Sequence, residues 1–212
     1  HIHLLVDNNP KVPSRIAVLV EGHGESPAPV LVQMAQNLER AGADLLAIPC
    51  NTAHAYLDHI RGAVAIPVLD MIQMTAHRLT ELPSEPKTVG VIASSAVLKT
   101  ELYGQALEAC GLDVVLPVAA DQDAVMVLIK KVKRGQVSTA DHQRFSDIAN
   151  GLVESGAQGI AVACTDLSVM GQDHLIIDVP LVDALDVLTE AIVACVGQLA
   201  QSPARESVQV IQ

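Results

Sequence analysis

Two cysteines, Cys50 and Cys164, occupy matching places in the chain and could act as a pair. Each closes a short apolar run, LLAIPC (45–50) and GIAVAC (159–164). A thiolate can remove a proton from carbon, and a thiol can supply one. If the two sulfur atoms face each other across a small ligand, protons leave one face of a carbon and arrive at the other. The pair therefore predicts inversion of a stereocentre, with neither a metal nor an organic cofactor.

Other roles for the cysteines need partners that this sequence does not supply. A cysteine hydrolase needs one cysteine with a positioned imidazole. A structural zinc site needs four ligands, but the four cysteines, at 50, 110, 164 and 195, lie far apart without a CxxC spacing. Cys110 and Cys195 fall in helical patterns and are expected to be core residues. A buried, inert thiol is the alternative for Cys50 or Cys164 taken singly.

The elements around the two cysteines form an internal repeat. A helical pattern ending in glycine precedes each apolar run, and the glycine lies eight residues before the cysteine in both copies. A further apolar run, IPVLD (66–70) or VPLVD (179–183), follows each cysteine. Glycine after a helix and short, continuous apolar runs are typical of βαβ units with buried parallel strands. The helical patterns span residues 30–44 and 142–158.

The second copy has additional elements before its helix, namely a strand at 88–94, a helix at 98–111 and a strand at 112–118. The first copy begins at HIHLLVD (1–7), which matches only the last of these. We therefore expect an α/β fold of two pseudo-symmetric lobes, each a parallel sheet flanked by helices. The first strand and helix of lobe one are expected to be missing from this chain.

The repeat also predicts the boundaries of the two lobes. Lobe one is expected to comprise residues 1–70 together with 183–212, and lobe two residues 87–182. A terminal helix at 186–200 would join lobe one, and residues 201–212 would be frayed or docked on a partner. Because ligands bind outside the carboxyl ends of parallel strands, the site is expected in the cleft between the lobes. The helix that starts after each cysteine could lower the pKa of its thiol.

Composition excludes several classes of partner. Thirteen Lys and Arg against 24 Asp and Glu give a net charge of −11, which disfavours nucleic acid and anionic membranes. No apolar run approaches the roughly 18 residues of a membrane span. Scattered cysteines and the lack of a signal-peptide pattern favour a reducing cytoplasm. With no Trp, one Phe and two Tyr, the core must consist of aliphatic side chains, as in buried parallel strands.

Three segments resemble the aspartate/glutamate racemase superfamily, and most closely aspartate racemases. They are DNNPKVPSR (7–15), PCNTAH (49–54) and ACTDLSV (163–169), and the likeness runs over almost the whole chain. The resemblance implies a racemase that works without pyridoxal phosphate and is usually a homodimer. It also implies two α/β lobes with one catalytic cysteine from each. Those positions fall on Cys50 and Cys164.

The resemblance implies a set of contacts to a small amino-acid substrate. Arg15 and Lys133 would hold carboxylate, because a guanidinium can bind it with two hydrogen bonds and an ammonium supplies a point charge. Three further residues would bind the α-carboxylate and amine. His54 lies one helical turn after Cys50 and could either influence the thiolate of Cys50 or pack the helix. No metal site is expected. The remaining substrate-binding residues are Asn51, Thr52 and Thr165.

The sequence departs from the family pattern in three places, and these leave the substrate open. The glycine-rich first loop is absent from the chain, ACTD replaces the usual GCTE, and SSAV (94–97) replaces a loop rich in threonine and glycine. Aspartate is the leading substrate, with glutamate or a broad range of amino acids as the alternative. The alternative to a racemase is a protein of another functional class, a homologue that binds carboxylates but has no catalytic activity.

Overall fold

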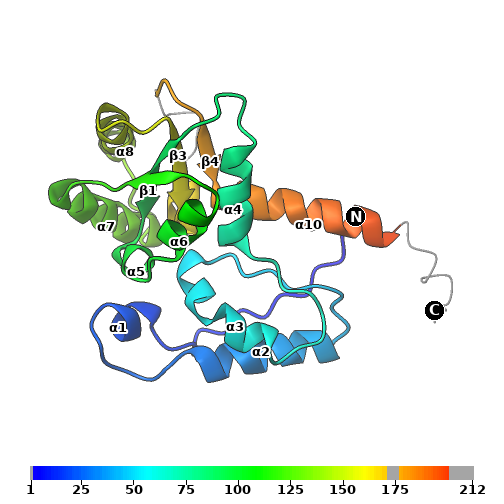
Figure 1. Cartoon of the computed structure of the whole chain (residues 1–212). Helices are drawn as coiled ribbons and strands as arrows, with labels where there is room; N and C mark the ends of the chain where they lie inside the picture. The colour runs from blue at the N-terminus through cyan, green and yellow to red at the C-terminus, as the bar shows by residue number, and fades with distance from the viewer. Residues whose placement is uncertain (1, 171–176, 201–212) are drawn as a thin grey trace.

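The computed structural model describes residues 2–170 and 177–200. At its centre lies a parallel sheet of four strands in the order β2-β1-β3-β4 (Figure 1). The strands are β1 (Thr88–Ala93), β2 (Asp113–Val115), β3 (Gly159–Ala163) and β4 (Leu181–Asp183). The predicted α/β class, with a parallel sheet flanked by helices, is confirmed. Residues 171–176 and 201–212, and the predictions made for them, lie outside the described part.

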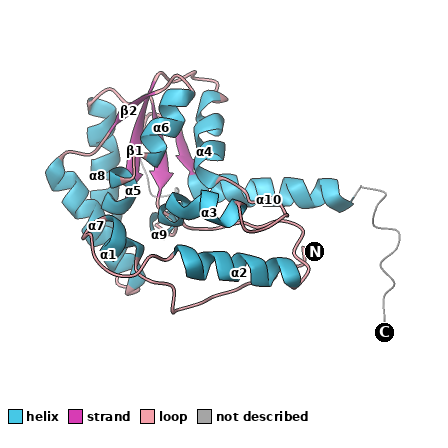
Figure 2. Ribbon diagram, turned by 60° about the horizontal axis from the view of Figure 1, so that its bottom comes forward, coloured by secondary structure: helices cyan, strands magenta, loops and turns pink. Residues whose placement is uncertain are grey.

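Helices cover both faces of this sheet (Figures 1 and 2). Side chains along a strand point alternately to the two faces, so Ala161 packs toward one helical layer while Ile160 and Val162 pack toward the other. The buried sheet is lined by small and aliphatic side chains, as the composition predicts. One layer contains α4 (Met71–Thr80), α6 (Leu102–Ala109) and the start of α10 (Ala184–Ala200), and the other contains α7 (Ala119–Lys133) and α8 (Thr139–Glu154).

Gly90 on β1 is required by the closeness of α8 to the sheet. A Cβ atom at Gly90 would lie 2.7 Å from Cδ1 of Ile160 and 3.0 Å from Cβ of Leu152. Gly90→Ala is therefore expected to lower the free energy of unfolding by about 1–3 kcal/mol through overpacking. Gly104→Ala in α6 is the matched control, because nothing lies within 4 Å of its added Cβ. It should raise stability by about 1 kcal/mol, and urea unfolding of both variants would test the difference.

Residues 2–70 form a smaller body below the sheet in Figure 1. Leu46, Leu57, Ile60 and Val68 form the core of this body. Its predicted strands at 45–50 and 66–70 are reduced to one parallel bridge, between Leu46 and Val68. Four short or medium helices complete it, namely α1 (Arg15–Leu19), α2 (Ala28–Arg40), the 3-10 helix η1 (Asn51–Tyr56) and α3 (Leu57–Arg61).

The strand predicted at 1–7 is wrong for the residues that the structure describes. Residues 2–9 have no regular secondary structure, and Leu4 and Val6 are 67% and 80% exposed. A strand forms only where a neighbour pairs with its backbone, and none of the described segments does so here. The helix predicted at 98–111 is interrupted, because Glu101 has a left-handed φ of 55° between α5 (Ser95–Lys99) and α6.

The internal repeat is visible in the backbone. Gly42 and Gly156 end α2 and α8 with φ of 93° and 99°, and the bridge between Leu46 and Val68 matches the pairing of Ile160 with Leu181. Up to the cysteines, equivalent residues in the two copies are 114 positions apart, and Val68 and Leu181 beyond them are 113 apart. The pseudo-symmetry therefore extends to individual turns and hydrogen bonds, even where the first copy has lost its strands. The pairs lie at 42 and 156, 46 and 160, and 50 and 164.

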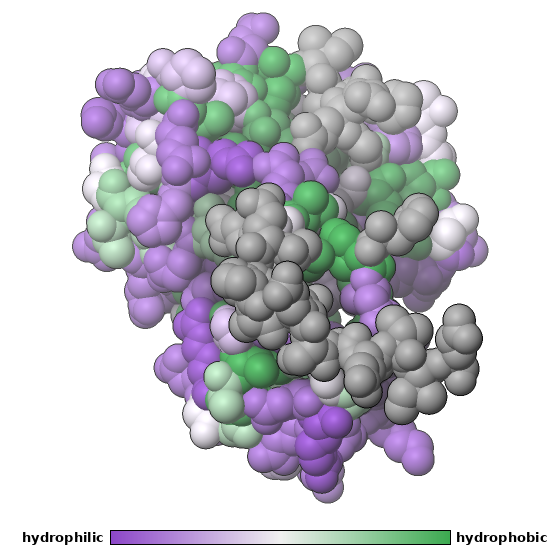
Figure 3. Space-filling view, turned by 90° about the vertical axis from the view of Figure 1, so that its right-hand side faces the viewer, coloured by the Kyte–Doolittle hydropathy of each residue, from purple (hydrophilic) through white to green (hydrophobic). Residues whose placement is uncertain are grey.

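Two helices join the smaller body to the sheet. Met71 at the start of α4 packs with Ala184 and Leu188 of α10, and Ala47 and Leu69 of the smaller body lie against this cluster. The face that presents the end of α10 is largely hydrophilic, with apolar side chains gathered near its centre (Figure 3). The division into lobes at 1–70 plus 183–212 and 87–182 stays a prediction, as does the homodimer.

Candidate active site

All seven residues predicted for the site line one cavity of about 340 Å³. They come from both bodies of the molecule. The smaller body supplies the start of α1, the start of η1 and the residue before it, and the sheet body supplies the two residues after β3 and the end of α7. The cavity lies at the carboxyl end of the sheet, where α/β folds bind ligands. Ser94, which follows β1, also lines it, so the SSAV segment faces the site. The seven are Arg15, Cys50, Asn51, Thr52, Lys133, Cys164 and Thr165.

Cys50 and Cys164 have nearly the same backbone conformation. Their φ and ψ angles are −155° and 108° for Cys50, and −152° and 114° for Cys164. Each carbonyl accepts a hydrogen bond from the residue three positions on, Ala53 in one copy and Leu167 in the other. The predicted helix after each cysteine is present, as η1 and as the single turn α9 (Thr165–Ser168). The two thiols therefore enter the cavity from equivalent turns.

The backbone N–H groups at the start of the helix act to lower the thiol pKa of Cys164, as expected, but other effects outweigh them. Burial and the nearby charge of Asp166 raise the pKa of this thiol to about 11, despite hydrogen bonds from the backbone of Asp166 and Leu167. The side chain is buried, with 9% of its residue surface exposed. A single helical turn has little macrodipole to offset these effects. Cys164 is therefore a thiol at neutral pH in this conformation.

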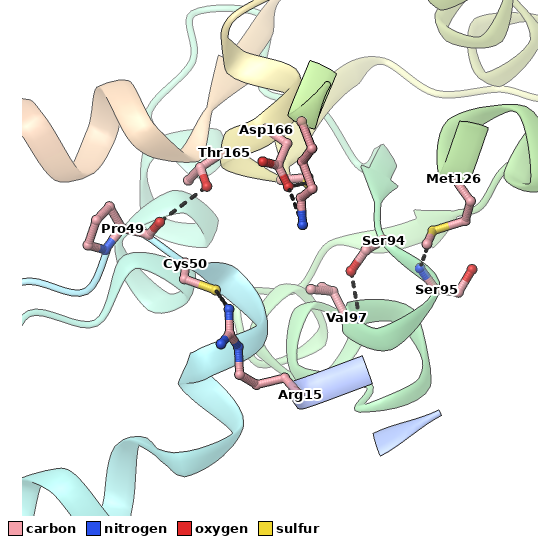
Figure 4. A network of polar contacts seen from close by, with 11 residues as sticks. Arg15, Pro49, Cys50, Ser94, Ser95, Val97, Met126, Thr165 and Asp166 are labelled. Atoms are coloured by element: carbon pink, nitrogen blue, oxygen red, sulfur yellow. Dashed lines mark hydrogen bonds and ion pairs between the residues drawn. The ribbon is translucent and has the colours of Figure 1, made fainter. Parts of the chain in front are cut away.

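Cys50 has a cation beside it instead. Nη2 of Arg15 donates a hydrogen bond to Sγ of Cys50 over 3.9 Å (Figure 4). Arg15 begins α1, which is capped by Ser14, whose hydroxyl accepts a hydrogen bond from the backbone of Ala17. The cap fixes the start of this short helix. The segment before Arg15 thus delivers the guanidinium to the cavity.

Asp166 is a cavity residue that sequence reasoning did not include in the site. Its Oδ2 lies 3.2 Å from Nζ of Lys133, and Sγ of Cys164 donates to the same oxygen over 3.9 Å. Lys133 is therefore in the cavity as predicted, but its charge is paired with an acidic residue of the protein. The signal available in the sequence was the acidic residue two positions after the cysteine, at the start of the predicted helix.

Contacts between the two bodies hold the remaining residues. The hydroxyl of Thr165 donates to the carbonyl of Pro49 over 3.1 Å (Figure 4). The hydroxyl of Tyr103 donates to Oδ1 of the buried Asn51 over 2.7 Å. Tyr103 is itself buried, in α6, and lies 52 positions from Asn51, so no local pattern could have revealed this contact. Asn51 and Thr165 therefore fix the two bodies relative to each other beside the cysteines.

His54 supports the backbone of Cys50 and packs η1. The backbone N–H of Met71 donates to Nε2 of His54 over 3.1 Å, so Nδ1 carries the proton and donates to the carbonyl of Cys50 over 3.0 Å. Burial lowers the pKa of His54. The ring is neutral and acts on the carbonyl of Cys50 rather than on its sulfur. Of the two roles considered for His54, the structure favours helix packing.

His54 should make stability fall in acid. Because its pKa in the folded protein lies below 6.5, the unfolded chain takes up a proton first as the pH drops below 6.5. The stability contributed by neutral His54 is thus complete above 6.5 and is lost as the pH falls toward the folded pKa. In urea unfolding, His54→Gln should be less stable than the wild type at neutral pH and lose less stability on acidification. His77→Gln, at an exposed position of α4, should retain the wild-type pH dependence.

In residues 2–170 and 177–200, no three His, Cys, Asp or Glu side chains are grouped so that they could hold a metal ion. None of the described helices combines the length and apolar character that crossing a bilayer requires.

Comparison with known sequences gives one consistent family. A family model described as Asp/Glu/Hydantoin racemase matches residues 1–192. The broad specificity amino-acid racemase RacX of Bacillus subtilis (strain 168) is 29% identical over 167 residues, which covers 77% of this chain and 70% of that protein. A glutamate racemase of a Sulfurihydrogenibium species is 28% identical over 124 residues, or 58% of this chain and 46% of that protein.

Solved structures agree with this result. The aspartate racemase of Picrophilus torridus superimposes with a TM-score of 0.80 at 26% identity, covering 93% of this chain and 80% of that chain. The glutamate racemase of Francisella tularensis superimposes with a TM-score of 0.65 at 19% identity, covering 92% and 69%, and supports the fold alone. The resemblance seen in the sequence is thus confirmed. Because the family model matches most of its length, the chain belongs to the Asp/Glu/hydantoin racemase family, whose members are isomerases that act without pyridoxal phosphate.

Proposed function

We propose that the protein racemises an amino acid, with aspartate as the leading substrate, by proton transfer between Cys50 and Cys164. The observation that carries this proposal is that both thiols line one cavity and enter it from equivalent turns of the repeat. Such an arrangement is suited to a ligand held between two acid–base groups. A single nucleophilic cysteine would not need the second thiol.

The proposed reaction has two proton transfers. The thiolate of one cysteine takes the proton from Cα, and the thiol of the other gives a proton to the opposite face. The α-carboxylate needs a cation nearby, because negative charge spreads onto it when the Cα–H bond breaks. Arg15 is placed for this role, since its guanidinium lines the cavity beside Cys50. Asn51, Thr52 and Thr165 would complete the contacts to the carboxylate and the ammonium group.

Aspartate is favoured because the cavity contains two cations, Arg15 and Lys133. They could bind the two carboxylates of this substrate, and Asp166 could accept the ammonium group. The likeness to the Picrophilus torridus aspartate racemase supports the same substrate.

A broad range of amino acids is the second candidate, and the pairing of Lys133 with Asp166 favours it. A lysine already neutralised by an acidic neighbour attracts a side-chain carboxylate less strongly than a free lysine. Neutral side chains would then be accepted as well as acidic ones, including glutamate as one member of the range. The likeness to RacX of Bacillus subtilis supports this candidate.

Exchange of the Cα proton in deuterated water tests the proposal directly. Each enantiomer of aspartate should gain deuterium at Cα and convert to the other enantiomer, as followed by NMR and chiral chromatography. If no amino acid of a broad panel exchanges, the proposal fails. Binding of aspartate without exchange would then favour the catalytically silent homologue.

Lys133→Met separates the two substrate candidates. If Lys133 binds a side-chain carboxylate, the substitution should lower kcat/KM for aspartate by about tenfold or more and leave alanine nearly unchanged. Equal rates for aspartate and alanine in the wild type, with no selective loss in the variant, would instead support broad specificity. Lys130→Met is the matched control, because Lys130 is an exposed residue of the same helix that does not line the cavity.

A further inference from the structure

The two thiols of the cavity have hydrogen-bond neighbours of opposite character. Arg15 faces Cys50, and a guanidinium has only donors, so the sulfur of Cys50 must accept. Asp166 faces Cys164, and an ionised carboxylate has only acceptors, so the sulfur of Cys164 must bring a proton. Each contact spans 3.9 Å. The arrangement therefore suits a thiolate at Cys50 and a thiol at Cys164 (Figure 4).

The negative charges near Cys164 disfavour a thiolate on this sulfur. Asp166 of α9 and a thiolate at Cys50 both oppose a negative charge on this sulfur. Lys133 of α7 could favour it, but its Nζ is bound to Asp166, and its side chain is 55% exposed. Burial adds to the effect, because a thiolate loses more hydration than a thiol when water is excluded. These effects together raise the pKa of Cys164 to about 11.

Cys50 differs in exposure and in the sign of its neighbours. It is partly exposed, whereas Cys164 is buried. Arg15 of α1 contacts its sulfur, and the neutral His54 faces its carbonyl rather than the sulfur. Although the turns carrying the two thiols are equivalent, their surroundings are not.

We propose that Asp166 is a positioning residue that holds Cys164 as a thiol in the ligand-free enzyme, while the guanidinium of Arg15 favours the thiolate form at Cys50. This inference rests on the proposed two-cysteine reaction and assigns the starting role of each cysteine. In the first half-cycle, the thiolate of Cys50 takes the Cα proton and the thiol of Cys164 gives its proton to the opposite face. The enzyme is left with a thiol at Cys50 and a thiolate at Cys164.

The same residue drives the return to the starting state. A thiolate at Cys164 lies beside the carboxylate of Asp166, so it regains a proton from water readily, while Cys50 releases the one that it took. The proton count is conserved, because one proton enters at Cys164 and one leaves at Cys50. A substrate carboxylate that takes Lys133 away from Asp166 would leave the Asp166 charge less compensated. Substrate binding would then hold Cys164 protonated more strongly.

Titration of the ultraviolet absorbance of the thiolate tests this role. Subtracting the Cys164→Ser curve from that of the parent protein isolates Cys164. Removing the neighbouring charge with Asp166→Asn should lower the pH at which Cys164 ionises by about one to two units. Asp166→Glu, which keeps the charge, should leave the midpoint closer to that of the wild type than to that of Asp166→Asn. Asp123→Asn, at an exposed position of α7, should leave it unchanged.

Alkylation provides the second measurement. At neutral pH, peptide-resolved mass spectrometry with iodoacetamide should show Cys50 modified faster than Cys164, with a smaller ratio in Asp166→Asn. An unchanged Cys164 midpoint in Asp166→Asn, or faster modification of Cys164 than of Cys50 in the wild type, would overturn the inference. Circular dichroism at each pH shows where the protein is folded, and only those pH values are compared. Neither measurement requires catalytic turnover. A protein without activity would therefore refute the proposed function but would not decide the role of Asp166.

Discussion

Serine in place of either Cys50 or Cys164 should abolish racemisation, with a loss of at least about 10³-fold in kcat, since each thiol supplies an acid–base step that an alcohol performs poorly. Both positions line the cavity, so either substitution removes one of its two proton-transfer groups. Conversion of each enantiomer of the preferred amino acid, followed by chiral chromatography, gives the measurement. Full activity in one variant would remove that cysteine from the mechanism.

Deuterium exchange should distinguish the two variants from each other. Cys164→Ser keeps the base on the Cys50 side, which can remove and return a proton on the same face of Cα. It should therefore exchange the Cα proton of one enantiomer without inverting that enantiomer. Cys50→Ser should exchange the Cα proton of the opposite enantiomer more slowly, because Cys164 is mainly a thiol at neutral pH. A one-base mechanism predicts that both variants, if they exchange at all, favour the same enantiomer.

The other two cysteines provide controls for both experiments. Cys110 ends α6 and packs against the core of the sheet, and Cys195 lies in α10. Neither lines the cavity. Cys110→Ser and Cys195→Ser should keep kcat near that of the wild type, with Cys110→Ser losing some stability because it places a hydroxyl against apolar neighbours.

Much of the site could be predicted because the repeat specifies where strands end. Gly42 and Gly156 stop their helices, and the apolar runs that follow lead to Cys50 and Cys164 in the same number of residues. The carboxyl ends of such runs converge in α/β folds, so the two thiols could be assigned to one cavity from sequence. Arg15 and Lys133, taken from the resemblance to a family, also line it.

Other features depend on contacts that no local pattern encodes. The run at 45–50 has the composition of a buried strand, but strand formation depends on pairing, and only Leu46 pairs, with Val68. The contact between Tyr103 and Asn51 joins distant segments. The net direction of the pKa shift at Cys164 could not be predicted, since a helix start was visible in the sequence but burial and the orientation of Asp166 were not. The pKa of a site residue was thus harder to predict from the sequence than its position in the fold.

Arg15 is the second position at which a large loss is expected. Its guanidinium lies 3.9 Å from Sγ of Cys50 and lines the cavity, and in the proposed reaction it also binds the substrate carboxylate. Arg15→Gln removes a charge-assisted hydrogen bond worth about 1.5–3 kcal/mol and should lower kcat/KM by about 10²-fold. Both kcat and KM should change, because the carboxylate is bound in the ground state and gains charge in the transition state.

Arg15→Lys separates charge from geometry at this position. A lysine keeps the positive charge but cannot form the planar, two-bonded contact with a carboxylate, so this variant should recover part of the activity lost in Arg15→Gln. Steady-state kinetics of both variants, beside Arg40→Gln as a control on the exposed end of α2, would give the comparison. Wild-type kcat/KM in Arg15→Gln would contradict the proposed role. The α-carboxylate would then have to be held by Lys133 and the backbone N–H groups beside the cysteines, and the assignment of aspartate would lose one of its two cations.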